Sequence, residues 1–243
     1  MKRLSLASLA MLAGLMIMPA GNAYSASLVN DLGGPVGFGP DSVARGDDTW
    51  LQVDVSAEFP NDLNFAGTFY DIFWANQNGN ITFDTGVGTY TPQPFPCGHP
   101  MFAAWWLDID TRAVPADVNE NLVWYFKETG RFVVTFWETG YYNLHLDLRN
   151  SFQIIVTDRS ADFAPGDFDV EYRYNRCEWL TGDASGGAGG FGGTMGSMGF
   201  DLNDGTTFWQ HPDSFTANII NLCTADGNTL EGGVPVPGVW RFE

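Results

Sequence analysis

The chain has 243 residues and carries 11 basic against 29 acidic residues, a formal net charge of −18. A protein this acidic repels phosphate backbones and anionic lipid headgroups, so we expect no nucleic-acid partner and no attachment to a membrane surface. Aromatic residues make up 15% of the chain and charged residues only 16%. Disordered chains show the opposite balance, so the composition indicates a folded protein.

The first residues have the pattern of a secretory signal peptide. Lys2 and Arg3 precede an apolar run that reaches Met18, and small residues follow at Gly21 and Ala23. The run is short for a membrane span, which favours cleavage after Ala23 over anchoring. Cleavage removes two of the 11 basic residues and shifts the net charge from −18 to −20. We therefore expect a secreted, extracellular or periplasmic protein with no membrane insertion after cleavage.

The remaining chain is predicted to be β almost throughout. Alternating or β-branched runs predict strands at residues 51–55, 81–83, 151–157, 168–174 and 239–242. Two further runs, 122–126 and 131–137, are separated by Glu128-Thr129-Gly130, which is typical of a hairpin. We expect an all-β, antiparallel β-sandwich-like domain at residues 41–243, preceded by a lead segment at 24–40.

Two segments depart from the strand pattern. Residues 214–222 predict one short helix, with Ser214 as its cap and Ile219, Ile220 and Leu222 facing inward. Residues 181–199 are dominated by glycine but contain no lysine, so they do not match a phosphate-binding loop. We expect a long surface loop there, and we expect it to supply contacts to a partner.

The chain has three cysteines, Cys97, Cys177 and Cys223. An exported protein permits disulfides, and an odd count allows one bond within the chain and leaves one thiol. Both a Cys177–Cys223 and a Cys97–Cys177 bond fit the sequence. The alternative is that all three are buried as small apolar residues.

Asp108 and Asp110 are candidate metal ligands. They follow an apolar strand, and alternate strand residues share a face, so the two carboxylates could share a Ca²⁺ ion. In the alternative interpretation they accept backbone amides at the strand end and Arg112 is their ion partner. Calcium takes six or more oxygens, and only two carboxylates are close in sequence here. No other cofactor is predicted.

Other motifs are weaker. The tripeptide Arg45-Gly46-Asp47 is of a type found in cell-adhesion ligands, in a stretch expected to be exposed, but tripeptides often arise by chance. No serine has the spacing of a nucleophile elbow, and we predict no catalytic residues. One set of aromatic residues could form a sugar platform or belong to the core: Trp105, Trp106, Trp124, Tyr141 and Tyr142.

Several segments, taken together and in order, resemble the nidogen-like extracellular domain. They are 76–83 (NQNGNITF), 104–112 (AWWLDIDTR), 131–142 (RFVVTFWETGYY), 150–158 (NSFQIIVTD), 174–179 (YNRCEW), 182–187 (GDASGG), 199–200 (GF), 204–205 (DG) and 238–242 (GVWRF). The resemblance covers about residues 41–242. The style of the signal peptide and the single domain are typical of a bacterial member.

The resemblance implies an extracellular protein associated with cell–matrix adhesion, without a catalytic residue set. We therefore expect a non-enzymatic module for adhesion or extracellular recognition, whose partner is an extracellular protein or a glycan. Two alternatives stay open. One is a secreted carbohydrate-active hydrolase or glycan-binding protein, and the other is a matrix component that associates with itself.

Overall fold

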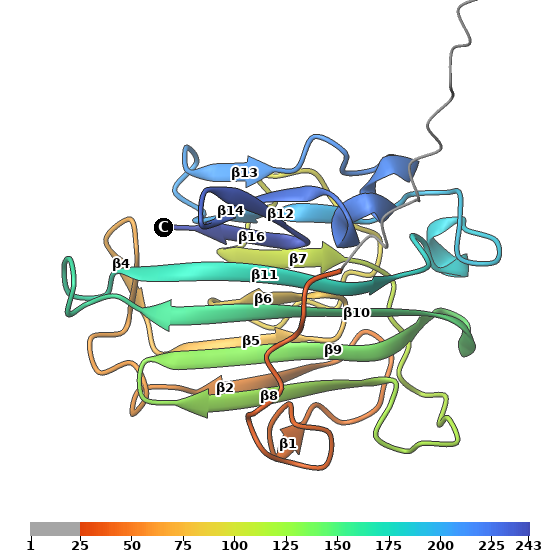
Figure 1. Cartoon of the computed structure of the whole chain (residues 1–243), viewed down its shortest axis with the longest axis horizontal. Helices are drawn as coiled ribbons and strands as arrows, with labels where there is room; N and C mark the ends of the chain where they lie inside the picture. Colours follow the sequence, from red (N-terminus) through yellow and green to blue (C-terminus); the bar gives the residue numbers. More distant parts are fainter. Residues whose placement is uncertain (1–24) are drawn as a thin grey trace, which may run out of the picture.

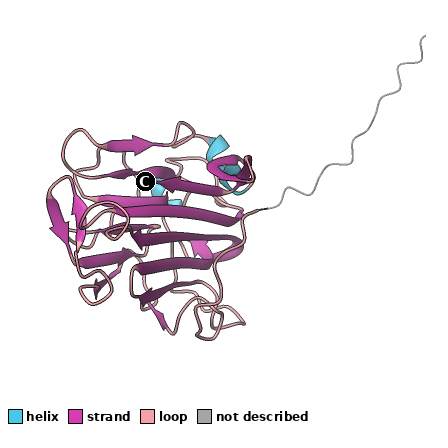
Figure 2. Cartoon of the chain, turned by 60° about the vertical axis from the view of Figure 1, so that its left-hand side comes forward, coloured by secondary structure: helices cyan, strands magenta, loops and turns pink. Residues whose placement is uncertain are grey.

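The computed structural model describes residues 25–243, so the predicted signal peptide at 1–23 lies outside the described residues. Two six-stranded antiparallel sheets pack face to face, as Figures 1 and 2 show. The predicted all-β, antiparallel sandwich is therefore confirmed. Among the described residues, no helix is long and apolar enough to cross a membrane.

The first sheet holds the longest strands and lies in front in Figure 1. Its strand order is β1-β8-β9-β10-β11-β16. The bounds are β1 Asp41–Ser42, β8 Leu122–Glu128, β9 Arg131–Tyr141, β10 His145–Asp158, β11 Phe168–Cys177 and β16 Val239–Phe242.

The second sheet lies behind the first and has the order β13-β12-β7-β6-β5-β2. The bounds are β2 Trp50–Asp54, β5 Ile72–Asn76, β6 Asn80–Thr82, β7 Met101–Trp106, β12 Ser197–Asp201 and β13 Phe208–Gln210. Two small hairpins pair β3 (Leu63–Phe65) with β4 (Thr68–Tyr70) and β14 (Asp226–Glu231) with β15 (Val234–Pro237).

The predicted hairpin forms between β8 and β9. The register pairs Glu128 with Arg131, which leaves Thr129 and Gly130 as the turn. Gly130 has a φ of 74°, a left-handed conformation that glycine adopts without a steric penalty. The strong β-branched and aromatic runs on both sides of this turn were sufficient to predict it.

The predicted helix forms with a different start. The structure has a 3₁₀ helix, η2, at Ala217–Cys223, and its cap is Thr216, whose side chain accepts a hydrogen bond from the Asn218 amide. The predicted cap at Ser214 is wrong because the Ser214 hydroxyl lies buried against β12, where it accepts from the Met198 amide at 3.2 Å. A second short 3₁₀ helix, η1, spans Asp183–Ser185.

Aromatic side chains fill the space between the sheets. Trp105 of β7 contacts Phe152 of β10 and Tyr174 of β11, with ring centroids 6.0 and 6.2 Å apart. Phe152 also stacks on Phe136 of β9 at 4.5 Å. Each of these rings is fully buried. Large aromatic side chains bury 150–250 Å² each, so this layer supplies much of the hydrophobic stabilisation.

Residues 25–40 cross the outer face of the first sheet (Figure 1). The Ala26 amide donates to the Tyr174 carbonyl on β11, and the Val29 amide donates to Gln153 Oε1 on β10. Leu32 and Phe38 of this segment are buried against the sheet, Leu32 with Val133 and Ile155 and Phe38 with Leu122 and Trp124. The lead segment therefore covers apolar residues of the sheet, and the domain boundary at residue 41 stays a prediction.

A disulfide joins Cys177, at the end of β11, to Cys223, at the end of η2. Of the two pairings that the sequence left open, the structure has this one, and Cys97 is a free, half-buried thiol. The bond closes a loop of 46 residues that includes the glycine-rich segment. It therefore ties the C-terminal helix to the sheet.

Replacing both Cys177 and Cys223 by alanine should lower the free energy of unfolding by about 2–4 kcal/mol, because the open chain gains conformational entropy when unfolded. Urea unfolding followed by tryptophan fluorescence measures the change. Cys97→Ala is the control and should cost less than about 1 kcal/mol. Equal losses in the two proteins would contradict a stabilising role for the disulfide.

Candidate functional site

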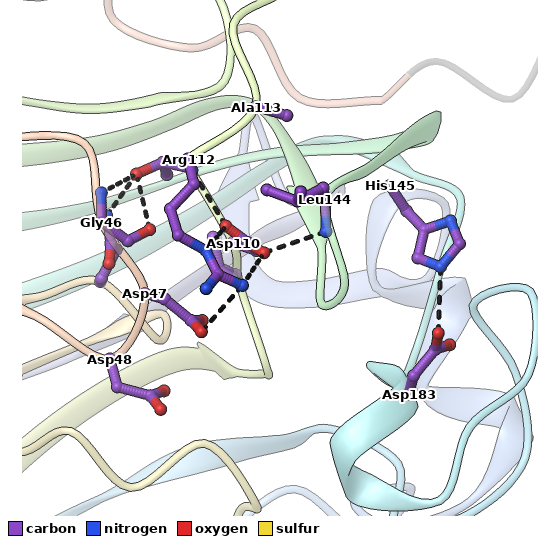
Figure 3. Close-up of polar contacts among 12 residues, drawn as sticks. Gly46, Asp47, Asp48, Asp110, Arg112, Ala113, Leu144, His145 and Asp183 are labelled. Carbon is purple, nitrogen blue, oxygen red and sulfur yellow. Dashed lines mark hydrogen bonds and ion pairs between the residues drawn. The ribbon is translucent and has the colours of Figure 1, made fainter.

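Five segments that are far apart in sequence meet at one end of the sandwich. They are residues 45–49, 76–80, 107–112, 142–145 and 181–183. This is the end of β9 that carries Tyr141, on the right in Figure 1. Figure 3 shows some of the polar residues that gather there, among them Asp47, Asp48, Asp110 and Arg112.

Asn78 joins three of these segments. It is fully buried, and its Nδ2 donates to Asp48 Oδ1 at 2.7 Å. Its Oδ1 accepts from the Ile109 amide at 3.0 Å, and its backbone carbonyl accepts from the Leu107 amide. The next residue, Gly79, has a φ of 87°, and an added Cβ would collide with the Trp105 carbonyl. The Asn-Gly turn therefore fixes the path of the chain on both sides of Asp108.

Asp110 is held by Arg112, as the alternative interpretation of the sequence expected (Figure 3). Its Oδ1 accepts from Arg112 Nε at 2.9 Å, and its Oδ2 accepts from Arg112 Nη2 at 2.6 Å and from the Leu144 amide at 3.0 Å. Burial opposes ionisation, but the hydrogen bonds from Arg112 and Leu144 prevail and lower the pKa of Asp110 below its usual range. Asp110 is thus an ionised carboxylate with its donors in place.

Asp108 has a different environment. Its side chain is 2% exposed, and neither carboxylate oxygen has a hydrogen-bond partner among the described residues. Gly182 packs directly on the carboxylate, so that a Cβ at this position would collide with it. Buried polar groups almost always have partners, so two unpaired oxygens on one carboxylate require an explanation.

Asp108 lies beside two other acids, Asp47 and Asp48. One oxygen from each of the three side chains lies within 4.8 Å of the others. Ionised carboxylates at that separation repel by about 3 kcal/mol or more at an effective dielectric constant of 20. Asp47 Oδ1 is also buried without a partner, while Asp47 Oδ2 pairs with Arg112 Nη2 at 3.0 Å.

Burial is the largest cause that raises the pKa values of this cluster, and repulsion from neighbouring carboxylates raises those of Asp108 and Asp47 further. Desolvation and the charges of Asp48, Asp47 and Asp110 raise the pKa of Asp108 to about 8. Desolvation, Asp48 and Asp110 raise the pKa of Asp47 to about 6, against the opposing effect of Arg112. Burial also raises the pKa of Asp48, although the hydrogen bond from Asn78 opposes it.

The structure therefore separates the two aspartates that the sequence paired. Asp108 stays a candidate metal ligand, but its neighbours in the cluster are Asp47 and Asp48, and the oxygens of Asp110 are taken up by Arg112 and Leu144. The sequence pattern did not indicate Asp48 as a ligand, and it indicated a role for Asp47 only within a tripeptide. The adjacent acids Asp47 and Asp48 could have indicated a ligand pair, but no local pattern indicated that they lie next to Asp108 in the fold.

The tripeptide Arg45-Gly46-Asp47 is built into the fold and is half-buried, not exposed as expected. The Arg45 guanidinium donates to the backbone carbonyls of five residues at 2.8–3.2 Å: Thr111, Ala113, Val118, Glu120 and Asn121. The Gly46 amide donates to Thr111 Oγ1, and Asp47 pairs with Arg112. The Arg45 guanidinium and one of the two Asp47 oxygens are thus occupied within the protein.

Arg45→Ala should lower the free energy of unfolding by about 2–4 kcal/mol, because several carbonyls of the 111–121 loop lose a charged donor. Chemical denaturation measures the loss. Arg131→Ala is the control, since Arg131 makes a surface ion pair with Glu128 and a contact with the Phe126 ring but donates to no set of loop carbonyls, and its loss should cost less than about 1 kcal/mol. A cost for Arg45→Ala no larger than for this control would contradict the structural role.

Cys97 lies on the opposite side of the second sheet from the main core, in a small cluster with Phe95, Met101 and Trp106. Burial, with help from the nearby Asp201 charge, raises the pKa of its thiol to about 11. A thiol needs to ionise to react as a nucleophile or a metal ligand. The environment of Cys97 therefore suppresses both kinds of chemistry.

The native protein should react with an aromatic disulfide reagent at pH 8 at least tenfold more slowly than a free cysteine peptide. The high pKa leaves little thiolate, and the greater nucleophilicity of that thiolate offsets only part of the loss. Absorbance of the released reagent measures the rate, and one thiol per chain should appear promptly in denaturant. Rapid reaction of the native protein would contradict the burial of Cys97.

The aromatic residues considered as a sugar platform belong mostly to the interior. Tyr142 is partly exposed. The other four are at most 5% exposed: Trp105, Trp106, Trp124 and Tyr141. These residues therefore do not form an exposed row of aromatic faces on which a sugar could stack.

A separate groove of about 500 Å³ opens at the other end of the sandwich, on the left in Figure 1. It lies between the β10–β11 turn, the β12–β13 turn and the last strand, and aromatic residues supply much of its wall: Phe102, Phe163, Phe168, Phe200 and Phe242. Phe163 is 68% exposed, and its ring lies under the guanidinium of Arg159 at 5.7 Å. The groove thus presents apolar surface to solvent.

Known proteins resemble this chain over most of its length. Alpha-tectorin of Mus musculus is 29% identical over 204 residues, which covers 74% of this chain and 9% of alpha-tectorin. Nidogen of Drosophila melanogaster is 26% identical over 207 residues, which covers 74% of this chain and 14% of that protein. The chain therefore spans only a small part of these relatives. No solved structure matches it.

The family comparison agrees with these relatives. The profile described as the nidogen-like domain matches residues 71–243, which include Asp108 of the acidic cluster, most of the residues that line the groove, and the disulfide. The match covers well over half of the chain, and the predicted resemblance is confirmed. The chain belongs to the nidogen-like domain family.

Proposed function

We propose that this chain is a non-enzymatic module for extracellular recognition or adhesion, and that it binds an extracellular protein. Membership of the nidogen-like family over residues 71–243 carries the proposal. The family's extracellular occurrence agrees with the signal peptide predicted at residues 1–23. The strongly acidic composition favours a partner with basic groups, because complementary charge speeds association.

The groove at the β10–β11 end is the contact surface that the geometry favours. Exposed apolar surface bordered by polar groups is typical of protein-binding sites on soluble proteins. Phe163 is the most exposed large apolar residue of the wall, and Arg159 and Asp167 lie beside it. Aromatic and arginine side chains contribute most to binding energy at protein interfaces.

The glycine-rich loop at 181–199 was the expected contact surface, and the structure gives its two ends another role. Gly182 is buried against Asp108 of the acidic cluster, and the segment from Ser197 onward is strand β12. Only the tip of the loop presents a large apolar side chain, Phe191, at 45% exposure. The groove is therefore the better supported surface.

An enzyme is the weaker candidate for a geometric reason. The carboxylate with the most perturbed pKa, Asp108, is buried, and its oxygens lie under Gly182 and away from the groove. A glycoside hydrolase needs its acid and its second carboxylate on either side of a bond in an accessible cleft. Glycan binding in the groove and self-association stay as the alternatives that an experiment has to distinguish.

The mature chain, residues 24–243, should bind saturably to at least one member of a panel of immobilised extracellular matrix proteins, measured by surface plasmon resonance. Phe163→Ser should weaken this binding at least tenfold, because it removes a central aromatic contact. Val114→Ser is the matched control, since Val114 is 60% exposed elsewhere on the surface and should change binding less than twofold.

The same panel contains glycans and the chain itself. Saturable binding to glycans alone, or cleavage of a polysaccharide, would replace the proposal by the carbohydrate-active alternative. Self-association at micromolar concentration without other binding would favour a structural component of a matrix. Equal effects of Phe163→Ser and Val114→Ser would remove the groove as the contact surface.

A further inference from the structure

We propose that Asp47, Asp48 and Asp108 form a binding site for a divalent cation, and that the cation is Ca²⁺. This site goes beyond the recognition function, and it lies at the opposite end of the sandwich from the groove. The proposal rests on the convergence of three carboxylates and on the unpaired, buried oxygens of Asp108.

The buried carboxylate of Asp108 is the feature that points most directly to a ligand. The residue is 2% exposed and both of its carboxylate oxygens are unpaired, one oxygen of Asp108 lies within 4.8 Å of an oxygen of Asp47 and of Asp48, and Asp47 Oδ1 is also unpaired. At this end of the molecule the buried amides of Asn78 and Asn121 have both donors and acceptors, whereas the buried Thr181 hydroxyl, like Asp108, has no partner among the described residues. A positive ion would be a favourable partner for all three unpaired oxygens, the two of Asp108 and Oδ1 of Asp47.

The protein's own cations do not fill this place. Arg112 is used by Asp110 and by the other oxygen of Asp47, and Arg45 Nη1 and Nη2 donate to backbone carbonyls. Four acids, Asp47, Asp48, Asp108 and Asp110, therefore share one arginine. A divalent cation would balance most of the remaining negative charge.

The donor set indicates which ion fits. Of the six carboxylate oxygens, Arg112 takes one from Asp47 and Asn78 takes one from Asp48, which leaves both oxygens of Asp108 and one from each neighbour. Calcium takes six to eight oxygens and accepts irregular geometry, so four carboxylate oxygens and some water molecules suit it. Magnesium demands a regular octahedron, and zinc prefers nitrogen and sulfur ligands, which this cluster lacks.

The ligands are held in place by neutral contacts that do not depend on the ion. Asn78 fixes Asp48 and the 107–109 turn together, and the Tyr142 amide donates to the Asp108 carbonyl at 3.1 Å. Gly182 has no side chain and so leaves room for the Asp108 carboxylate, with which a Cβ would collide. A cation would therefore join the 45–49 loop to the end of β7 beneath the glycine-rich loop, and would stabilise this end of the sandwich.

The test is a thermal unfolding series on the mature chain with Ca²⁺, with Mg²⁺ and with a chelator. At a Ca²⁺ concentration one hundred times Kd, the Tm should rise by about 5–10 °C over the value in chelator. Mg²⁺ should give a smaller rise at the same concentration. Tb³⁺ luminescence gives a direct second readout, because Trp50 lies two residues from Asp48 and can sensitise the bound ion.

Asp108→Asn is the decisive variant because it keeps the shape of the side chain and removes its charge. It should abolish the Ca²⁺-dependent rise in Tm and weaken Tb³⁺ binding at least tenfold, while its Tm in chelator equals or exceeds that of the wild type. Asp47→Asn, at the half-buried rim, serves as a second variant if Asp108→Asn does not fold. Asp71→Asn, an exposed aspartate on another surface, should behave as the wild type.

Each remaining outcome overturns the site. Equal Tm values in Ca²⁺ and in chelator, without Tb³⁺ luminescence, would mean that Asp108 is a neutral, protonated core residue. An unchanged response in Asp108→Asn and Asp47→Asn would mean that ions bind elsewhere on the acidic surface. Phe163→Ser should keep the full Ca²⁺ response, so failure of the recognition function and failure of this site are distinguishable.

Discussion

The packing of aromatic side chains between the two six-stranded sheets is the constraint on which the other features depend. Trp105, Phe152 and Tyr174 interlock across the gap, so the register of β7 against β10 and β11 is fixed. Because side chains alternate along a strand, a shift by one residue would turn these rings outward. The register in turn decides that β7 ends at Trp106 and that Asp108 lies at the buried edge of the core.

Buried asparagines connect the loops that leave this core. Asn121 donates to the carbonyls of Asp110 and Ala113 and accepts from the Gly140 amide, and Asn150 links β10 to Glu178 and Trp179 in a similar way. An amide side chain has both donors and an acceptor, so it can satisfy backbone groups of two segments without introducing a charge. Asp108 is a carboxylate in a comparable position, and that contrast is what marks it as a functional candidate.

The sequence predicted features that depend on local pattern. The β8–β9 hairpin, the strands of the first sheet other than β1, and the family resemblance all followed from alternation, turn residues and the order of motifs. The start of η2 was wrong because Ser214 and Thr216 are both good caps, and only the packing of Ser214 against Met198 decides between them. Local propensity had no information about that contact.

The candidate site was predictable only in part for the same reason. Asp108 and Asp110 were noticed because they are close in sequence, but Asp48 and Asn78 reach them from 60 and 30 residues away. Which aspartates pair with Arg112 also depends on the fold: Arg112 forms ion pairs with Asp110 and Asp47 and makes no contact with the Asp108 carboxylate. Asp108 and Asp110, two positions apart in the chain, therefore have opposite electrostatic environments.

The separation of the groove from the acidic cluster limits how the two can influence each other. The groove lies at the Arg131 end of β9 and the cluster near its Tyr141 end, and an 11-residue strand spans about 35 Å. The close-packed sandwich lies between the groove and the acidic cluster, and no loop belongs to both sites. Energetic effects of distant sites on a rigid scaffold are close to additive. An ion at Asp108 would therefore act on the stability of the module, while the affinity of the groove would depend on its own aromatic wall.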